Sequence, residues 1–488
     1  MSVLSELKPR EVFRFFEEIC GIPHGSGNVD RISDYLVSFA KERGLFYIQD
    51  ELKNVIIVKE ASAGYEEEPA LIIQGHMDMV AVKKPELDMD MRTEGLRLAV
   101  DGDLIYAQGT SLGGDDGIAV AYILALLDDG KLAHPRLEAV ITVDEEVGMD
   151  GARGIDLSML TGHRMLNLDS EEEGIFLASC AGGARVHTYV PYTTVSKEGV
   201  SYRVTVGGLL GGHSGGEIHK ERGNSNCLMG RLLYALTAEL PVCLVSMEGG
   251  LADNAIPRQT EAVLVTDQQN EERMCEMIRT AEREIRTELA VKDPGFVITV
   301  EREAEGKYDC ADAESTAQLA SYLLALPGGV QGMSADIPGL VETSLNLGIM
   351  QLQGEEQELS CDFSVRSCIE SAKRTVIGKV CAVTELAGGS YSVSGDYPGW
   401  AYRADSPLRE KMIRVYERMY GKKPEVQAIH AGLECGILAS KIEDLDCISM
   451  GPDMRDIHTT EETLSISSTG RVWEYIVALL AEKDGAAV

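Results

Sequence analysis

Histidine and acidic side chains occur at five places along this chain, each just after an apolar run or at the start of a helical one. The first pair follows the run 71–73, and its members are two residues apart. Alternate residues of an extended chain project to the same side, so this pair can meet at one point. The five places are His76 with Asp78, Asp115 with Asp116, Glu145 with Glu146, Asp169, and His458.

These residue types predict a metal site. Carboxylates gathered without a cation would raise one another's pKa, so their clustering is unfavourable unless positive charge is present. Two histidines and several carboxylates without cysteine form the ligand set of hydrolytic zinc, with cobalt and manganese as alternatives in the same pocket. A carboxylate shared by two ions about 3.5–4 Å apart is typical of two-metal hydrolases.

Each place also has an ordinary explanation when it is taken alone. Asp115 or Asp116 would cap a following helix. The acid pair at 145–146 would be a solvated loop pair. Asp169 would begin a surface acidic run, and His458 would be a capping or core histidine. Their joint occurrence after apolar runs favours a shared site.

The elements around these places predict an α/β catalytic domain. Short buried strands alternate with helices, which indicates a mostly parallel sheet with helices on both faces. Ligands in such sheets bind beyond the carboxyl ends of the strands. The pattern predicts two helices between 9 and 39 around a glycine-rich turn at 20–28, strands at 54–58, 70–73, 139–143 and 164–168, and a buried helix at 118–127.

The pattern changes near residue 187 and predicts an inserted α+β domain, serving as a lid or for dimerisation. The predicted catalytic domain is discontinuous (1–186 and 393–488), and the insert spans 187–392. Glycine-containing joins near 182–187 and 389–399 suit hinges. The insert would contain two similar halves, although no clear sequence repeat is present. Its predicted strands are 202–206, 242–246, 261–266, 296–300, 344–353 and 358–366, with helices at 226–239, 271–289, 313–326 and 372–386.

Composition limits the classes of partner. The chain has 488 residues, with 45 Lys and Arg against 79 Asp and Glu, a formal net charge of −34. This balance argues against nucleic acid or anionic membranes as partners. Eleven cysteines without C-x-x-C spacing predict reduced, mostly buried thiols. With no signal-peptide pattern at residues 1–20 and no apolar run of membrane-spanning length, the expected location is the cytoplasm.

The combined motifs resemble the M20 metallopeptidases, and within them the aminoacyl-histidine (Xaa-His) dipeptidase branch. The resemblance covers essentially the whole chain, including the insert. Each motif alone is weak, but the set is specific. The motifs are Gly75-His-Met-Asp78, Ser111-Leu-Gly-Gly-Asp-Asp-Gly117, Thr142-Val-Asp-Glu-Glu-Val-Gly-Met149, Asn167-Leu-Asp-Ser-Glu-Glu172, Ile457-His458, Cys180-Ala-Gly-Gly183, Gly211-Gly-His-Ser-Gly215, Asn254-Ala-Ile-Pro257 and His430-Ala-Gly-Leu-Glu-Cys435.

The resemblance implies a role for each residue of the metal site. His76 and Asp169 would hold one divalent ion, Glu146 and His458 would hold the other, and Asp115 would bridge them; zinc is favoured for both ions. Asp78 would bond the far ring nitrogen of His76. Glu145 would be the general base that moves a proton from water to the leaving amine.

The resemblance also implies roles for the insert. His213 would donate to the tetrahedral oxyanion. Asn254 and Arg366 would bind substrate, with the guanidinium of Arg366 holding the C-terminal carboxylate of a dipeptide. Without the resemblance, His213 lies in a plain glycine-rich loop, Asn254 in a turn and Arg366 at a strand end that suits a surface ion pair.

One departure and several alternatives remain. The branch often has Asn after the bridging Asp, where this chain has Asp116, so an Asp116 bridge is a second interpretation. The expected activity is hydrolysis of Xaa-His and other dipeptides. An M20 N-acyl amino acid deacylase or desuccinylase is one alternative, and a catalytically silent relative is another. The insert is long enough to form a homodimer or to contain both halves of a pseudo-dimer.

Overall fold

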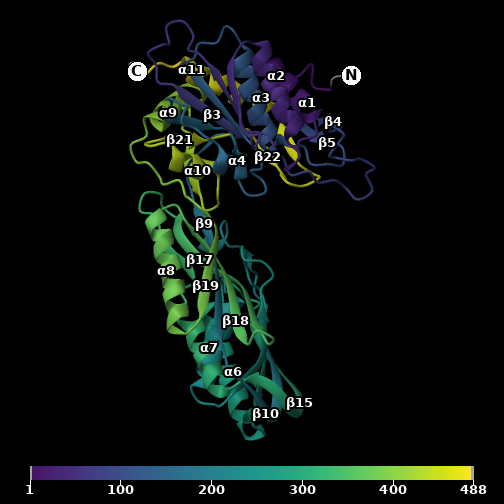
Figure 1. The fold of residues 1–488 in the computed structure, drawn as a ribbon, viewed down its shortest axis with the longest axis vertical. Helices are drawn as coiled ribbons and strands as arrows, with labels where there is room; N and C mark the ends of the chain where they lie inside the picture. Colours follow the sequence, from purple (N-terminus) through teal and green to yellow (C-terminus); the bar gives the residue numbers. More distant parts are fainter. Residues whose placement is uncertain (1–2, 485–488) are drawn as a thin grey trace. The chain divides into compact units, whose positions relative to one another are not determined.

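The computed structural model describes residues 3–484, which divide into two compact units (Figure 1). The first unit holds the residues up to Ser179, Tyr402–Ala428 and the residues from Leu433 onward. The second unit holds Cys180–Ala401 and Ile429–Gly432. The chain therefore leaves the first unit and later returns to it. The assignment of the second unit as a lid stays a prediction.

The first unit is an α/β structure. Its helices are α1 (Arg10–Cys20), α2 (Asp30–Glu42), α3 (Gly114–Asp128), α4 (Asp150–Gly154), α9 (Pro407–Tyr420), α10 (Glu434–Lys441) and α11 (Ile466–Ala481). Its strands are β1 (Phe46–Gln49), β2 (Val55–Lys59), β3 (Leu71–His76), β4 (Leu98–Asp101), β5 (Leu104–Ala107), β6 (Leu137–Thr142), β7 (Arg164–Asn167), β8 (Ile175–Cys180), β20 (Glu425–Ile429), β21 (Asp446–Ser449), β22 (Met454–Arg455) and β23 (Thr463–Ser465).

Eight of these strands form the main sheet in the order β1-β2-β6-β3-β7-β21-β8-β20. The four central strands, β6 to β21, pair in parallel, whereas β1, β2 and β8 pair antiparallel. The predicted α/β class with parallel strands is confirmed at the centre of the sheet. Parallel neighbours end at the same edge, which decides where the side chains after β3, β6 and β7 lie.

Both faces of this sheet are covered. On β3, Ile73 belongs to a core cluster that it shares with α1, α3, α9 and α11. Its neighbour Ile72 points to the opposite face and is also buried, at 1% exposure. On that face the short helices α4 and α10 contact each other, and α10 contacts β21. Strands buried on both faces are apolar throughout, as the runs 71–73 and 139–141 are.

The second unit is an α+β structure built on one antiparallel sheet. Its strands are β9 (Gly182–Pro191), β10 (Thr194–Gly207), β11 (Gly212–His213), β12 (Cys243–Gly249), β13 (Ala255–Ile256), β14 (Thr260–Thr266), β15 (Val297–Ala311), β16 (Gly329–Met333), β17 (Val341–Gln353), β18 (Glu358–Ser367) and β19 (Ser390–Tyr397). Its helices are α5 (Ser225–Thr237), α6 (Glu271–Glu288), α7 (Ala313–Ala325) and α8 (Glu370–Leu386), with short 3-10 turns at Ile218–Lys220 and Gln268–Asn270.

The sheet of the second unit contains two halves of similar topology. Its order is β15-β10-β14-β12-β17-β18-β9-β19. The chain path β10-α5-β12-β14-α6-β15 forms one half, and β9 with α7-β17-β18-α8-β19 forms the other. Read outward from the β12–β17 seam, the strands of the two halves follow the same order. The sequence hides this duplication because topology is preserved by apolar patterning rather than by residue identity.

The segments predicted as hinges form strands, and their role as hinges stays a prediction. The segments near 182–187 and 389–399 are not loose joins, because β9 and β19 occupy most of them and pair with each other in antiparallel register. Val186 lies opposite Val393 in this pair. Most of β19 is exposed, which fits an edge strand with polar residues and explains why its pattern resembles a loop.

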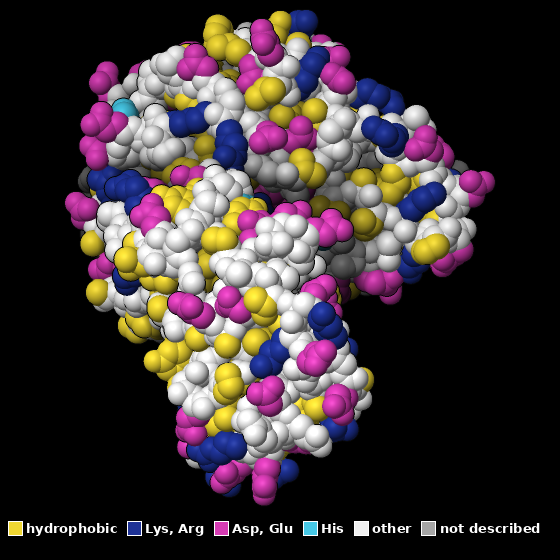
Figure 2. All heavy atoms as spheres, turned by 60° about the horizontal axis from the view of Figure 1, so that its bottom comes forward, with side chains coloured by type: hydrophobic (Ala, Val, Ile, Leu, Met, Phe, Trp, Pro, Cys, Tyr) yellow, Lys and Arg dark blue, Asp and Glu magenta, His cyan; other side chains and the backbone are white. Residues whose placement is uncertain are grey.

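Several compositional expectations can be compared with the structure. Eight of the eleven cysteines are buried, as predicted, and no disulfide joins any of them within residues 3–484. None of the helices within residues 3–484 has the length and apolar character of a membrane span. On the face drawn in Figure 2, acidic and basic side chains are interspersed.

Candidate metal centre

The carboxyl ends of three neighbouring strands bring the first group of side chains together. Strand β3 ends at His76, which lies opposite Thr142, the last residue of β6. On the other side of β3, Gln74 lies opposite Asn167, the last residue of β7. The residues after β6 and β7 therefore emerge beside His76 at the same edge of the sheet. These following residues are Glu145, Glu146 and Asp169.

Helix α3 contributes two more carboxylates from its first turn. Its preceding residue, Gly113, has a φ of 65°, and a Cβ there would lie 2.7 Å from the Met79 sulfur. A side chain at this position would be both strained and obstructed, so glycine is required. Asp115 and Asp116 follow, and both are buried. The first turn of α3 has no capping hydrogen bond from its N-cap side chain.

The His76 ring is oriented with one nitrogen toward the acidic residues. Its Nδ1 lies 3.0 Å from the Asp78 backbone oxygen, so Nδ1–H is the donor of this bond. Nε2 lies 3.1 Å from Asp115 Oδ1 and 3.8 Å from Asp169 Oδ1. A neutral ring with its proton on Nδ1 would direct a lone pair at these oxygens. Such a contact requires a proton or a metal ion between the acceptors.

Asp115 lies between two histidines. Its Oδ1 faces His76, and its Oδ2 lies 3.1 Å from Nε2 of His458. The same His458 nitrogen lies 2.9 Å from Glu146 Oε1, yet that buried oxygen has no hydrogen-bond partner within residues 3–484. The contact is close enough for an ion pair but has the wrong angle for a hydrogen bond. Asp115 thus joins two groups, His76 with Asp169 and Glu146 with His458.

The electrostatics of these groups fit the binding of cations. Each of two carboxylates about 4 Å apart opposes the ionisation of the other by roughly 4 kcal/mol at an effective dielectric constant near 20. Burial, together with the charges of Asp116 and Asp115, raises the pKa of Asp169 well above its usual range. Burial raises the pKa of Glu145 to about 8, and other acids nearby add to this. A divalent ion would relieve this repulsion.

The pKa values of the two histidines are also raised, which for a histidine favours the charged form. The hydrogen bond to Asp115 and the ion pair with Glu146 raise the pKa of His458 to about 10. Burial opposes charge on His76, but its contacts with Asp115 and Asp78 outweigh burial and raise its pKa. Burial likewise opposes ionisation of Asp115, and its bonds to both histidines lower its pKa. The donor set of imidazoles and carboxylates therefore fits two divalent ions.

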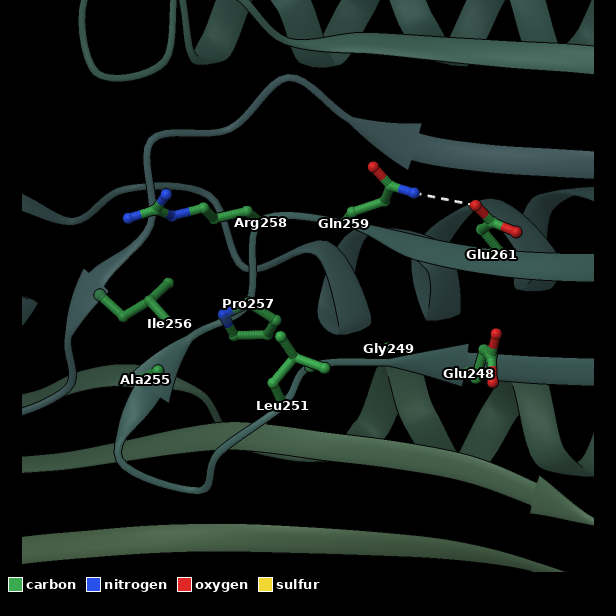
Figure 3. Close-up of a pocket in the computed structure, with 10 residues that line it drawn as sticks. Glu248, Gly249, Leu251, Ala255, Ile256, Pro257, Arg258, Gln259 and Glu261 are labelled. Atoms are coloured by element: carbon green, nitrogen blue, oxygen red, sulfur yellow. Dashed lines mark hydrogen bonds between the residues drawn. The ribbon is translucent and has the colours of Figure 1, made fainter. Parts of the chain in front are cut away.

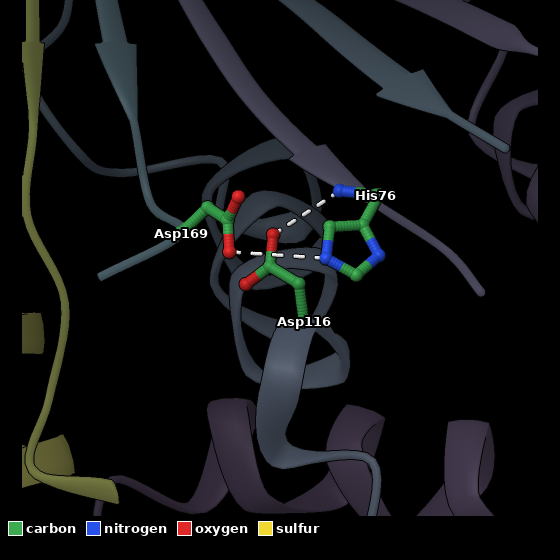
Figure 4. Close-up of side chains that lie close together, drawn as sticks. All are labelled: His76, Asp116 and Asp169. Atoms are coloured by element: carbon green, nitrogen blue, oxygen red, sulfur yellow. Dashed lines mark hydrogen bonds and ion pairs between the residues drawn. The ribbon is translucent and has the colours of Figure 1, made fainter. Parts of the chain in front are cut away.

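The Asp116 carboxylate contacts the His76 end of this group of histidines and acids. Its Oδ2 accepts the His76 backbone N–H at 3.1 Å, and Asp169 lies 3.8 Å from the ring of the same histidine (Figure 4). Its Oδ1 is buried and has no hydrogen-bond partner in the described chain. His76, Asp116 and Asp169 each offer a ligand atom within 4.8 Å of the others. The second interpretation of the bridge, through Asp116, therefore stays open.

Asp78 contacts the loop after β6 as well as His76. Its carboxylate lies 3.4 Å from His76 Nδ1, which is farther than its own backbone oxygen. The carboxylate oxygens instead accept hydrogen bonds from Ser26 Oγ at 2.8 Å and from the backbone N–H groups of Glu145 at 3.1 Å and Glu146 at 3.5 Å. Asp78 thus fixes the loop that follows β6.

Sequence patterns did not reveal two further buried acids. Glu434, at the start of α10, accepts hydrogen bonds from Gln74 Nε2 and Thr142 Oγ1, both at 2.6 Å. Its other oxygen is buried without a partner in residues 3–484. Glu462, four residues after His458, binds the backbone at the start of α3. The only sequence signal for Glu434 is its place within the 430–435 motif.

The predicted residues of the second unit lie in one region of that unit. Gly212 and His213 form β11, which pairs with β13. The His213 Nδ1 accepts the Gly216 backbone N–H at 3.0 Å, which leaves the ring proton on Nε2. Burial and the charge of Arg366 lower the pKa of His213, so the ring is neutral. A neutral ring with Nε2–H is a hydrogen-bond donor.

Arg366 and Asn254 flank this loop. A Cβ on Gly215 would lie 3.0 Å from the His213 ring and 3.2 Å from Arg366 Nε. Arg366 Nη1 donates to Tyr397 Oη at 3.4 Å, and its Nε is buried without a partner among residues 3–484. Asn254 is exposed, and its backbone oxygen accepts the Ser214 N–H at 2.8 Å.

The second unit has a hollow of about 600 Å³, lined by residues 248–251, 255–259 and 261 (Figure 3). Its walls come from the end of β12, from β13 and from the start of β14. Leu251 is fully exposed there, while Gln259 donates to Glu261 at 2.8 Å. None of the five predicted metal ligands lines this hollow, so we assign it no part of the site.

Comparison with known proteins gives a consistent result over the whole chain. Residues 72–482 match the model of peptidase family M20/M25/M40. The chain is 35% identical over 487 residues to the cytosol non-specific dipeptidase of Escherichia coli (strain K12), with 99% of each chain covered.

Solved structures extend the comparison to the fold. The aminoacylhistidine dipeptidase of Vibrio alginolyticus has a TM-score of 0.95 at 35% identity, covering 100% of this chain and 99% of that one. The aminopeptidase PepT of Bacillus cereus has a TM-score of 0.58 at 15% identity, with 97% and 98% covered. At that identity the second likeness shows the fold alone.

Proposed function

The chain belongs to peptidase family M20/M25/M40 and is a hydrolase, and on that premise we propose that it is a two-metal dipeptidase cleaving Xaa-His and other dipeptides. One observation carries the proposal. The two oxygens of the buried Asp115 carboxylate each lie 3.1 Å from a different histidine. A carboxylate placed between two imidazoles is suited to bridge two ions.

The proposed ligands divide into two sets. His76 and Asp169 hold one ion, Glu146 and His458 hold the other, and Asp115 is common to both. Zinc fits this nitrogen and oxygen set, with cobalt and manganese as alternatives. When bound, the ions polarise the scissile carbonyl and lower the pKa of water in the site.

Glu145 is the proposed general base. Its carboxylate takes a proton from the attacking water and later gives it to the nitrogen of the leaving amine. The backbone of Glu145 is held by Asp78 Oδ1 at 3.1 Å, which fixes the start of its side chain. Its place next to Glu146 on one loop supports this division of roles between base and ligand.

The second unit supplies the proposed substrate contacts. His213 carries its proton on Nε2, so it suits the role of donor to the oxyanion of the tetrahedral intermediate. The Arg366 Nε has no partner within residues 3–484, and its guanidinium suits a bidentate contact with the substrate's C-terminal carboxylate. Asn254 would be a further substrate-binding residue. The dipeptide names of the two relatives that align over the whole chain support a dipeptide as substrate.

We also infer a cytosolic enzyme without nucleic acid or membrane partners. The cytosolic name of the Escherichia coli relative supports the location. The net charge of −34 supports the exclusion of polyanionic partners.

The test combines metal analysis with substrate comparison. We expect close to two divalent ions per chain, and hydrolysis of carnosine-like and other dipeptides but not of N-acyl amino acids. Glu145→Ala should keep its metal and lose activity by at least about 100-fold, because general-base catalysis contributes that much or more.

Asp150→Ala, which changes an exposed acid shortly after the same loop, is the matched control and should retain wild-type activity. Near-wild-type rates in Glu145→Ala would mean that the assigned base is wrong. Hydrolysis of N-acyl amino acids alone would exclude the dipeptidase.

A further inference from the structure

Glu462 is a buried acid without a role in the proposed reaction. It lies four residues after His458 and is 3% exposed. Its carboxylate accepts four consecutive backbone N–H groups. Oε2 accepts from Leu112 at 2.7 Å and Gly113 at 3.0 Å, and Oε1 accepts from Gly114 at 2.8 Å and Asp115 at 3.4 Å.

These four bonds hold the turn that leads into α3, in which Asp115 and Asp116 have non-helical backbone angles, and the bonds from Gly114 and Asp115 lie where a helix cap would accept. The first N–H groups of a helix have no partner within the helix, and a local Ser, Thr, Asp or Asn usually accepts from them. Helix α3 is preceded by Gly113, which has no side chain to do this. Glu462 supplies the acceptor from about 350 positions away in the sequence. Hydrogen bonds to a carboxylate are about twice as strong as neutral ones.

Glu462 is used differently from the acid beside it. Glu461 is exposed and forms an ion pair with Lys84 at 2.7 Å. No ion pair of Glu462 is found among residues 3–484, where its hydrogen-bond partners are the four amides. Burying a carboxylate without a cation is costly, so the contact with the loop 112–115 must compensate.

We propose that Glu462 is a positioning residue of the metal centre, which clamps the loop 112–115 to the segment carrying His458 and so sets Asp115 against His458 before an ion binds. Asp115 Oδ2 and His458 Nε2 are 3.1 Å apart. Ligands that are already in position lose less conformational freedom on binding, which raises affinity. The inference rests on the proposed function, because it takes Asp115 and His458 as ligands of one ion.

The test compares metal affinity between two neighbouring variants. Metal-free protein is titrated with Zn²⁺ in competition with a chromophoric chelator. Glu462→Gln keeps the size of the side chain but turns an amide NH₂ toward backbone donors. We expect it to bind at least one ion 10–100-fold more weakly, the usual effect of losing a residue that orients ligands. Glu461→Gln should bind as the wild type does, and wild-type affinity in Glu462→Gln would overturn the proposal.

Two further readouts separate positioning from a general structural role. With Co²⁺ in place of zinc, the visible spectrum of Glu462→Gln should differ from the wild type, whereas that of Glu461→Gln should not. Excess zinc should restore most of the turnover of Glu462→Gln. If this variant had wild-type affinity and spectrum yet turned over slowly, the proposal would be wrong.

A measurement on the wild type covers the case in which Glu462→Gln does not fold. In metal-free protein, hydrogen exchange of a peptide containing Gly113 and Gly114 should be slow, because Glu462 holds both amides without an ion. Rapid exchange there would overturn the proposal. Wild-type protein that binds two ions but does not hydrolyse dipeptides would contradict the proposed substrate and leave this inference standing.

Discussion

Two histidines of this chain have their protons on different ring nitrogens, and each arrangement suits its proposed task. His76 donates from Nδ1 to a backbone oxygen, so Nε2 is the nitrogen that faces the acidic residues and would bind a metal ion. His213 accepts at Nδ1 from the Gly216 N–H, so Nε2 carries the proton that an oxyanion donor needs. In both cases a backbone group selects the form of the ring.

Asp78 offers a test of loop positioning at a single residue. Asp78→Asn replaces one acceptor oxygen with an NH₂ group, which faces Ser26 Oγ or the N–H groups of Glu145 and Glu146. We expect kcat, measured at saturating zinc, to fall by about 10–100-fold because the loop carrying the base moves. Ser26→Ala removes one of the three donors and should cost less. An equal loss in both variants would contradict the role of the loop contacts.

His430 makes the stability of the second unit depend on pH. Burial, with the charge of Arg366, lowers the pKa of His430 to about 4, and its Nε2 lies 2.8 Å from Ser344 Oγ. The unfolded chain binds a proton below pH about 6.5, whereas the folded chain does not until about pH 4. The contribution is therefore complete above pH 6.5 and is lost as pH falls, by roughly 3 kcal/mol at pH 4.

The corresponding variant is His430→Gln, made in a Trp473→Phe parent so that Trp400 alone reports the second unit, followed by urea unfolding between pH 7 and 4. We expect a smaller loss of stability over this range in His430→Gln than in the parent protein. His219→Gln, which changes an exposed histidine of the same unit, should behave as the parent. Identical pH profiles for all three proteins would contradict the assignment to His430.

At the scale of elements, the sequence predicts those residues of the site that lie just after the ends of strands. Apolar runs followed by acids identified the ends of β3, β6 and β7, and parallel pairing brings such ends to one edge. The His458 segment follows β21, the next parallel strand. The roles given to these residues are proposals, but their proximity follows from the order of the sheet.

Two buried acids could not be predicted, because their hydrogen-bond partners are distant in the sequence. Glu434 forms hydrogen bonds with Thr142 and Gln74, which are 292 and 360 positions away in the sequence. Glu462 accepts a hydrogen bond at the start of α3 from Gly114, 348 positions away. A buried acid whose partners are distant has no local pattern. The edge strand β19 was missed for a different reason, since its polar, exposed residues lack the apolar alternation of a half-buried strand.

At the scale of the whole molecule, the two units differ both in the type of sheet and in proposed function, metal binding in the first and substrate contacts in the second. The first unit uses parallel strand ends to gather buried charge. The second unit joins two similar four-stranded halves across the β12–β17 seam. β12 and β17 would each be an edge strand if its half stood alone, and their pairing covers both edges within one chain.

Removal of metal should therefore affect the first unit more than the second, because all proposed ligands belong to the first. The chain has two tryptophans, Trp473 buried in α11 of the first unit and Trp400 buried in the second. Thermal unfolding is followed by fluorescence in Trp400→Phe and Trp473→Phe, each with saturating zinc and after chelation. A ligand at about 1,000 times its Kd contributes roughly 4 kcal/mol, so chelation should lower the Tm reported by Trp473 by about 10 °C. The Tm reported by Trp400 should change much less, and equal shifts at both reporters would place the metal-dependent stability outside the first unit alone.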